Sequence, residues 1–274
     1  MLIAVSAWSF HAELYGGRLH VSEVPFRSYE LGFRAVELLD QFLWPAPPNR
    51  LARWLGRKAR VFDPHAYDRQ TLLRVKMNRV RSGTQLVAWG VESDLTAAGA
   101  ARDEQRRYLA QAIAAARWLG APLMRLTLGG EQADRAGYDR AVDLLSSVLP
   151  VAIASGVKLA IENHGGLSAD PQVLIDLATH FGSPFLGVCV DVGNFAGDAA
   201  EGVRRLAPHA LHVHAKAWAF DARCEETSID YAACLAALRA AGYDGVISIE
   251  YEGDGEAAAG VRAARRLIER HWRA

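Results

Sequence analysis

The chain repeats one pattern about eight times: a short apolar segment is followed by a turn and then by a longer amphipathic segment. Short apolar runs bounded by turns indicate strands, whereas apolar residues at helical spacing indicate helices. Regular alternation of the two predicts a parallel sheet, since each helix returns the chain to the same edge. Eight units within 274 residues predict an α/β fold, a (β/α)8 TIM barrel that residues 1–274 form as a single domain. A doubly wound open sheet is the alternative, but no strand precedes a Gly-x-Gly-x-x-Gly motif or a P-loop.

Each unit can be placed on the sequence. Asp170 and Asp198 are expected to cap the helices that follow them, because a carboxylate there accepts a hydrogen bond from a free backbone N–H. The other expected helices span residues 22–31, 49–57, 67–81, 103–119, 138–155, 231–241 and 261–272. The expected strands span residues 2–8, 34–39, 85–91, 123–128, 157–164, 186–192, 210–217 and 245–252.

Composition limits the classes of protein to which the chain can belong. Lysine and arginine together number 31, as do aspartate and glutamate, so the charge balance favours neither nucleic acid nor an anionic membrane as partner. The three cysteines form no Cys-x-x-Cys pair, which indicates a reducing compartment. The N-terminus lacks signal-peptide features, and no apolar run approaches the ~20 residues of a membrane span. We expect a soluble, cytoplasmic protein, and the sequence leaves a homo-oligomer open.

The segment Val-Lys-Leu-Ala-Ile-Glu-Asn-His-Gly-Gly, residues 157–166, runs from an apolar strand directly into charge. Side chains alternate between the two faces of a strand, so Glu162 and His164 are expected on one face and Asn163 on the other. The two glycines then end the strand. A carboxylate and an imidazole at the end of an apolar strand suggest a functional site, and three later strands end in a similar way.

Four polar residues end four successive expected strands: Glu162, Asp191, His214 and Glu250. Active sites of TIM barrels lie at the C-terminal ends of the strands, and neighbouring strands are only ~5 Å apart, so these side chains should converge. Three unpaired carboxylates in one place repel one another, and a divalent cation removes that conflict. One imidazole and three carboxylates without a thiolate predict one divalent metal ion, either Mn²⁺, Mg²⁺, Co²⁺ or Zn²⁺. For each residue taken alone, a surface carboxylate, a turn cap or a core histidine is the simpler interpretation.

Other polar and aromatic residues fall near the same strand ends. Glu37 is a candidate inward carboxylate on the second expected strand. His212 is expected one level deeper than the four residues, as a hydrogen-bonded core histidine, and Glu252 is expected to face solvent at the rim. Trp8 and Trp218 are candidates for the floor of a sugar pocket, with burial in the core as the alternative.

These segments also resemble a known family. Four motifs are similar to those of the xylose-isomerase-like sugar phosphate isomerase/epimerase family: Ile-Glu162-Asn-His164-Gly-Gly, Val-Asp191-Val-Gly-Asn194-Phe, His212-Val-His214-Ala-Lys216 and Ile-Ser-Ile-Glu250-Tyr-Glu. The resemblance is close in the C-terminal half, whereas the N-terminal half matches only in its strand–helix rhythm. It implies a TIM barrel with one catalytic divalent metal, whose ligands would be the same four residues.

The resemblance also implies a reaction on a carbohydrate or keto-polyol. In the ketose epimerases of this family, two metal-bound glutamates remove and return a proton beside the carbonyl, and these would be Glu162 and Glu250. Lys216 would be a further catalytic residue. Trp8 and Trp218 would contact the substrate.

The chain departs from the epimerase pattern at Asn194, where those enzymes usually have a histidine that touches the substrate. Asn194 would take over that contact. His164 and Lys216 instead resemble the dehydratase branch, such as 3-dehydroshikimate dehydratase, in which a base removes a proton and water leaves. A metal-dependent dehydratase is therefore the alternative to an isomerase or epimerase, and His164 would be catalytic in it.

Two other classes of function are compatible with the barrel. An abasic-site endonuclease needs three metals and extra histidines, but the second and third expected strands offer Glu37 and no histidine. A non-catalytic carbohydrate-binding barrel would bind its ligand without turnover. The basic stretch at residues 50–81 predicts either a solvated helical face or an edge that attracts an anionic substrate or an acidic patch on another subunit.

Overall fold

The computed structural model describes residues 1–43, 67–130 and 134–273. Its strands are all parallel to their neighbours and follow one another around the sheet in sequence order, with β8 pairing back onto β1. The sheet is therefore a closed barrel, which confirms the predicted fold. The strands are β1 Leu2–Ser6, β2 Ala35–Leu39, β3 Gln85–Val91, β4 Leu123–Thr127, β5 Lys158–Glu162, β6 Leu186–Asp191, β7 Ala210–Ala217 and β8 Val246–Tyr251.

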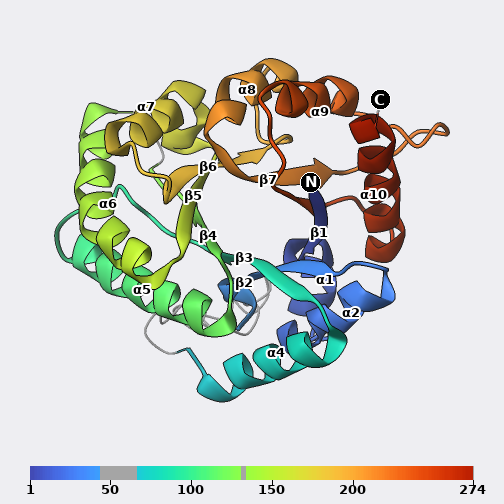
Figure 1. Ribbon diagram of the computed structural model, residues 1–274, viewed down its shortest axis with the longest axis horizontal. Coiled ribbons are helices and arrows are strands. Elements are labelled where there is room, and N and C mark those ends of the chain that lie inside the picture. The colour runs from blue at the N-terminus through green and yellow to red at the C-terminus, as the bar shows by residue number, and fades with distance from the viewer. Residues whose placement is uncertain (44–66, 131–133, 274) are drawn as a thin grey trace, which may run out of the picture.

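Helices surround the barrel on the outside (Figure 1), and the last of them packs on β8, which pairs with β1. The expected helix at residues 49–57 lies outside the described residues. Asp170 and Asp198 cap α7 and α8 as expected, each through a side-chain oxygen that accepts from the backbone two residues on. The helices are α1 His11–Tyr15, α2 Val24–Glu30, α4 Arg69–Ser82, α5 Gly99–Leu119, α6 Arg135–Ser155, α7 Pro171–Phe181, α8 Ala199–Leu206, α9 Tyr231–Ala240 and α10 Ala257–Arg273.

Two expected strands, residues 2–8 and 157–164, end two residues earlier than their apolar patterns suggest. β1 stops at Ser6, whose hydroxyl accepts a hydrogen bond from the backbone N–H of Trp8 and starts a 3-10 turn at Ala7–Phe10. β5 stops at Glu162, so the alternation of faces does not continue to His164. Local turn chemistry overrides the strand pattern at both places, and both lie at the end of the barrel where a TIM barrel has its active site.

The barrel interior consists of two kinds of layer. Inward positions near the middle of several strands carry small buried side chains, and the next inward positions toward the C-terminal ends carry buried polar ones. The small layer lies beneath the polar layer, as alternate inward positions of a barrel stack in layers. The small residues are Ala4, Ala35, Ala88, Ala160 and Cys189. The polar residues above them include Ser6, Glu37, Glu162 and Asp191.

The described part of the basic stretch forms α4. Its basic residues Arg69, Arg74 and Arg81 are exposed, and the described range of this stretch thus matches a solvated helical face. Residues 50–66 lie outside the description. No helix in residues 1–43, 67–130 and 134–273 is long and apolar enough to cross a membrane.

Candidate active site

The four polar residues expected at strand ends come together inside the C-terminal mouth of the barrel. Each offers one ligand atom, and these atoms all lie within 4.8 Å of one another. His214 is central, because its Nδ1 lies 2.9 Å from Glu162 Oε1 and 3.5 Å from Glu250 Oε1. The same Nδ1 lies 3.9 Å from Asp191 Oδ2. All four side chains are buried, so their charges act on one another with little screening by water.

Arg125 on β4 is a buried cation that the strand-end motifs do not include. Its Nε lies 3.6 Å from Glu162 Oε2, and one terminal nitrogen lies 3.1 Å from Glu92 Oε1. Burial raises the pKa of Glu162, but Arg125 and then His214 outweigh it and hold that pKa below its ordinary value. Glu162 is therefore an ionised carboxylate. The sequence carried a signal for Arg125, since an arginine interrupts the otherwise apolar β4 at an inward position.

Asp191 is held by hydrogen bonds at its backbone and at one carboxylate oxygen, while the other oxygen makes no hydrogen bond within the described part of the chain. The side-chain amide of Asn163 donates to the Asp191 carbonyl at 2.9 Å and its oxygen accepts from the Asp191 N–H at 2.8 Å. Asp191 Oδ1 accepts from the Gly193 N–H, whereas the buried Oδ2 has no hydrogen-bond partner among the described residues. Burial raises the pKa of Asp191 to about 7, although Lys216 Nζ, 3.2 Å from Oδ2, lowers it. A buried carboxylate oxygen that makes no hydrogen bond suits a metal ligand.

Lys216 lies between carboxylates at the mouth of the barrel. Its Nζ is 2.9 Å from Glu252 Oε1 and 3.7 Å from Glu250 Oε2. Burial lowers the pKa of Lys216, but Asp191 and these glutamates outweigh it and keep the ammonium charged. The expectation that Glu252 simply faces solvent is wrong, since it also accepts from Trp8 Nε1 at 2.5 Å. The Lys216 ammonium is nearly buried and has lost most of its hydration, so contact with the Glu252 carboxylate compensates that loss.

His212 lies one level below the four residues, beside Cys189, and contacts Glu37. His212 is confirmed as a hydrogen-bonded core histidine: its Nε2 lies 3.0 Å from both Glu37 Oε2 and Ser248 Oγ. Glu37 is confirmed as an inward carboxylate with no exposed surface, and it also contacts His214 Nε2 at 3.1 Å. Burial raises the pKa of Glu37, but His214 and His212 outweigh it and hold that pKa well below its ordinary value.

A pocket of about 160 Å³ opens at the four-residue cluster. Both Glu162 and Glu250 line it, and Ser6 Oγ orients Glu250 by donating a hydrogen bond of 3.0 Å to Oε1. The pocket wall is strongly polar, with one aromatic side chain. Its lining residues are Trp8, Leu39, Gln41, Glu92, Arg125, Glu162, His164, Lys216, Glu250 and Glu252.

The structure divides the residues that were expected to meet a substrate. Trp8, His164 and Lys216 line the pocket, whereas Asn194 and Trp218 do not. His164 is exposed at the rim instead of buried on the same face as Glu162, because β5 has already ended. Trp218 packs against Gly193, where an added Cβ would lie 2.8 Å from the indole ring.

The cluster fits a divalent cation. Three carboxylates and one imidazole are ligands that Mn²⁺, Mg²⁺, Co²⁺ and Zn²⁺ accept. Burial lowers the pKa of His214, but Cys189, Glu250 and the other surrounding acids outweigh it and raise that pKa well above its ordinary value. The surroundings of His214 thus favour positive charge at the point where the ligand atoms of the cluster meet.

Asp40, just after β2, gives the protein a pH-dependent stability. It is fully buried and accepts hydrogen bonds from Tyr108 at 2.6 Å and Tyr67 at 2.8 Å. Burial raises the pKa of Asp40 to about 7, against these hydrogen bonds, which lower it. Between about pH 4 and about pH 7 the folded protein keeps a proton that the unfolded chain has released, so this contribution to stability falls as pH rises.

We therefore expect Asp40→Asn to remove this pH dependence, because the amide cannot ionise. Urea unfolding of the metal-free protein measures this. As pH rises from about 4 to about 7, the free energy of unfolding of the variant should increase relative to that of the wild type by at least about 1 kcal/mol. Parallel stability curves for the two proteins would show that Asp40 ionises normally in the fold.

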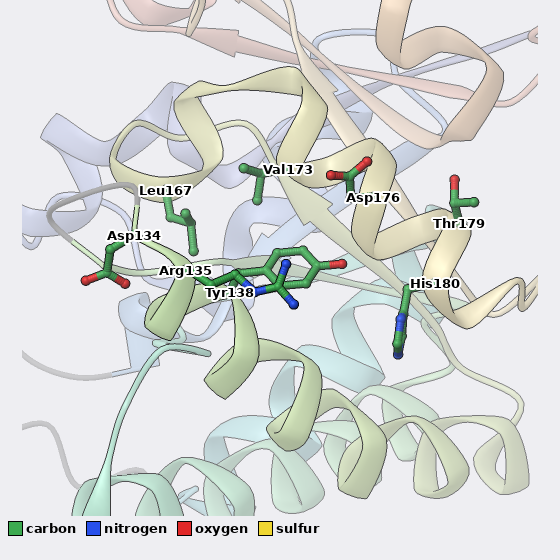
Figure 2. Close-up of a pocket in the computed structure, with 8 residues that line it drawn as sticks. All are labelled: Asp134, Arg135, Tyr138, Leu167, Val173, Asp176, Thr179 and His180. Atoms are coloured by element: carbon green, nitrogen blue, oxygen red, sulfur yellow. The ribbon is translucent and has the colours of Figure 1, made fainter.

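A larger hollow of about 500 Å³ lies on the outside of the barrel, between the start of α6 and α7 (Figure 2). None of the four clustered residues lines it. Arg135 at its edge is 82% exposed and pairs with Asp139 on its own helix. With its charges solvated and no buried ionisable group, this hollow lacks the converging groups of a catalytic site.

A model of the xylose isomerase-like TIM barrel family matches residues 27–271. The chain belongs to this family. The match confirms the resemblance that the C-terminal motifs indicated. One relative, the uncharacterized protein MJ1311 of Methanocaldococcus jannaschii, is 34% identical over 125 residues. That alignment covers 41% of this chain and 43% of the relative, so less than half of the relative's length is matched.

Solved structures with the same fold include an L-ribulose 3-epimerase, a D-tagatose 3-epimerase-like protein and a probable 3-DHS dehydratase. An L-ribulose 3-epimerase aligns with a TM-score of 0.74 and 19% identity over 99% of this chain and 94% of its own. A D-tagatose 3-epimerase-like protein aligns with a TM-score of 0.73 and 19% identity over 100% and 97%. The probable 3-DHS dehydratase AsbF from Bacillus anthracis aligns with a TM-score of 0.70 and 14% identity over 98% and 99%. At these identities the likeness establishes the fold.

Proposed function

We propose that the protein is a divalent-metal-dependent isomerase or epimerase of a sugar or sugar phosphate. One observation carries the proposal: Glu162 and Glu250 line the same small pocket, at the cluster that they form with Asp191 and His214. Two carboxylates that reach one pocket can remove a proton beside a carbonyl and return one. Membership of the family and the likeness in fold to sugar 3-epimerases support this assignment.

The residues of the pocket have distinct proposed roles. Glu162, Asp191, His214 and Glu250 would hold the metal, which when bound would polarise a carbonyl and stabilise the negative charge that develops on it. Glu162 is kept ionised by its neighbours, so it is in the unprotonated form that a general base requires.

The other proposed site residues would return the proton and hold the substrate. Glu250, oriented by Ser6, would return the proton to the substrate carbon. Lys216 would donate a hydrogen bond to a substrate oxygen, since its ammonium lines the pocket and is already held by Glu252. The Trp8 ring would provide an apolar wall for the sugar, and Asn194 and Trp218 would be contacts further out.

A dehydratase of a keto-polyol or of a 3-dehydroshikimate-like acid is the second candidate. His164 lines the pocket next to Glu162, where it would act as a base or would protonate the departing hydroxyl group. The likeness in fold to the probable 3-DHS dehydratase also supports this candidate. Both reactions begin with removal of a proton beside a carbonyl, so the same clustered residues serve either one.

We expect purified protein to contain about one divalent ion per chain, because one cluster of four ligands binds one ion. Turnover should be lost after treatment with EDTA and return with Mn²⁺ or Co²⁺. Elemental analysis and activity before and after chelation measure this. A protein that turns over substrate without metal and is indifferent to EDTA would contradict the proposal.

The reaction itself is identified by exchange with deuterated water over a panel of ketoses, their phosphates, inososes and 3-keto acids. Uptake of deuterium at the carbon beside the carbonyl without loss of water indicates an isomerase or epimerase. Formation of an enone indicates the dehydratase. Binding of a sugar without exchange, in protein that holds metal, would indicate a non-catalytic carbohydrate-binding barrel.

A further inference from the structure

Glu37 is a buried carboxylate that belongs neither to the four-residue cluster nor to the lining of the pocket. It has no exposed surface, and both of its oxygens face imidazole nitrogens. His214 Nε2 lies 3.1 Å from Oε1 and 3.1 Å from Oε2, and His212 Nε2 lies 3.0 Å from Oε2. A charge buried this deeply is costly unless hydrogen bonds compensate it, and the two imidazoles supply them.

The two ring nitrogens of His214 face different surroundings. Nδ1 is directed to the cluster, with Glu162 at 2.9 Å, whereas Nε2 is directed to Glu37. A neutral imidazole carries its proton on only one nitrogen, and the hydrogen bond at that nitrogen decides which one. An imidazole must be neutral to bind an ion, and with its one proton on Nε2 donated to Glu37, the lone pair of Nδ1 would point into the cluster. A histidine that binds a metal commonly donates its other N–H to a carboxylate, which fixes the ring and raises its basicity.

His212 and Ser248 fix the position of the Glu37 carboxylate in turn. His212 Nε2 is 3.0 Å from Ser248 Oγ as well as 3.0 Å from Glu37 Oε2. The rings of His212 and His214 are 5.4 Å apart and nearly perpendicular, so both nitrogens approach the carboxylate from separate directions. Two histidines of β7, one of them supported by Ser248 of β8, therefore hold a side chain that comes from β2.

We propose that Glu37 is a positioning residue, which holds the proton of His214 on Nε2 so that Nδ1 is available to a divalent cation in the cluster. The inference rests on the proposed function in one respect, namely that the cluster binds a divalent ion. It adds a fifth residue, from the opposite half of the sequence, on which the affinity for that ion depends.

The test is the affinity of the full chain for Co²⁺ and Mn²⁺, measured by titration calorimetry, together with the visible spectrum of bound Co²⁺. Glu37→Gln offers only one acceptor oxygen where the carboxylate offers two, so one imidazole N–H loses its partner. We expect binding to weaken by about 10–100-fold and the Co²⁺ spectrum to change. Glu37→Asp keeps two acceptor oxygens on a shorter stem, and we expect a smaller loss. It also serves as the test variant if Glu37→Gln does not fold.

Asp40→Asn is the matched control, because it makes the same change at an equally buried carboxylate that does not contact His214. It should bind both ions as the wild type does. A wild type that binds neither ion overturns the proposed function and this inference with it. A wild type that binds, with Glu37→Gln and Glu37→Asp of unchanged affinity and spectrum, overturns the positioning role alone. Weaker binding in Asp40→Asn as well would assign the effect to a general disturbance of the barrel interior and would also overturn it.

Discussion

Glu250→Gln should lower kcat by about 10²–10⁴-fold, the range that a positioned acid or base contributes. The amide has nearly the same shape and can still accept the hydrogen bond from Ser6, so the pocket should keep its form. It cannot carry a proton, however, and it removes one charge from the cluster of ligands. The measurement is the rate of deuterium exchange and of turnover on the substrate that the panel identifies.

Glu256→Gln provides the matched control for Glu250→Gln, since Glu256 is an exposed glutamate six positions later. It should leave turnover unchanged. Glu162→Gln should cause a loss similar to that of Glu250→Gln if the two carboxylates share the proton transfers. Near-normal exchange in Glu250→Gln would mean that the proton is carried by another group, and His164 at the rim would then be the first to test.

The second large effect is expected on stability. Arg125→Met should lower the free energy of unfolding of the metal-free protein by about 3–5 kcal/mol, the usual cost of removing one partner from a buried ion pair. Arg125 is 4% exposed and Glu162 is 2% exposed, so water does not replace the lost charge, and Glu162 keeps only His214 as a cationic contact among the described residues. Urea unfolding after chelation measures the effect.

Addition of a divalent ion should restore part of the lost stability in Arg125→Met, because the ion would supply positive charge to Glu162. Arg135→Met is the control: its ion pair is largely exposed, and its loss should change stability by less than about 0.5 kcal/mol. If Arg125→Met is as stable as the wild type without metal, Glu162 is not held as an ion by Arg125.

Much of the fold follows from the sequence because its signals are local and repeated. The apolar runs, the amphipathic segments and caps such as Asp170 each act within a few residues, so they can be read without knowing the neighbours in space. The cluster followed too, because parallel strands end at one edge of a barrel. Residue type and strand position were then enough to predict that Glu162 and Glu250 lie close together.

The hydrogen bonds and ion pairs that orient the clustered residues could not be predicted from local sequence patterns. Ser6 and Glu250 are separated by 244 positions in the sequence, and Glu37 and His214 by 177, so their contacts depend on the closure of the barrel. The contacts of Glu252 could not be predicted from the sequence either. Only the folded structure brings this rim carboxylate next to the buried ammonium of Lys216 and the indole N–H of Trp8.

His164 is a residue for which the sequence predicted the position in part and the tertiary structure corrected it. Its sequence position predicted the face of Glu162, but β5 ends before it, and the Ser168 hydroxyl accepts the hydrogen bond of its backbone N–H instead of a neighbouring strand. The sequence by itself determined the barrel and the four residues at its mouth, because these depend on periodicity and on strand ends. Only the tertiary structure decided their charge states and partners, because these depend on burial and on contacts between strands that are distant in the chain.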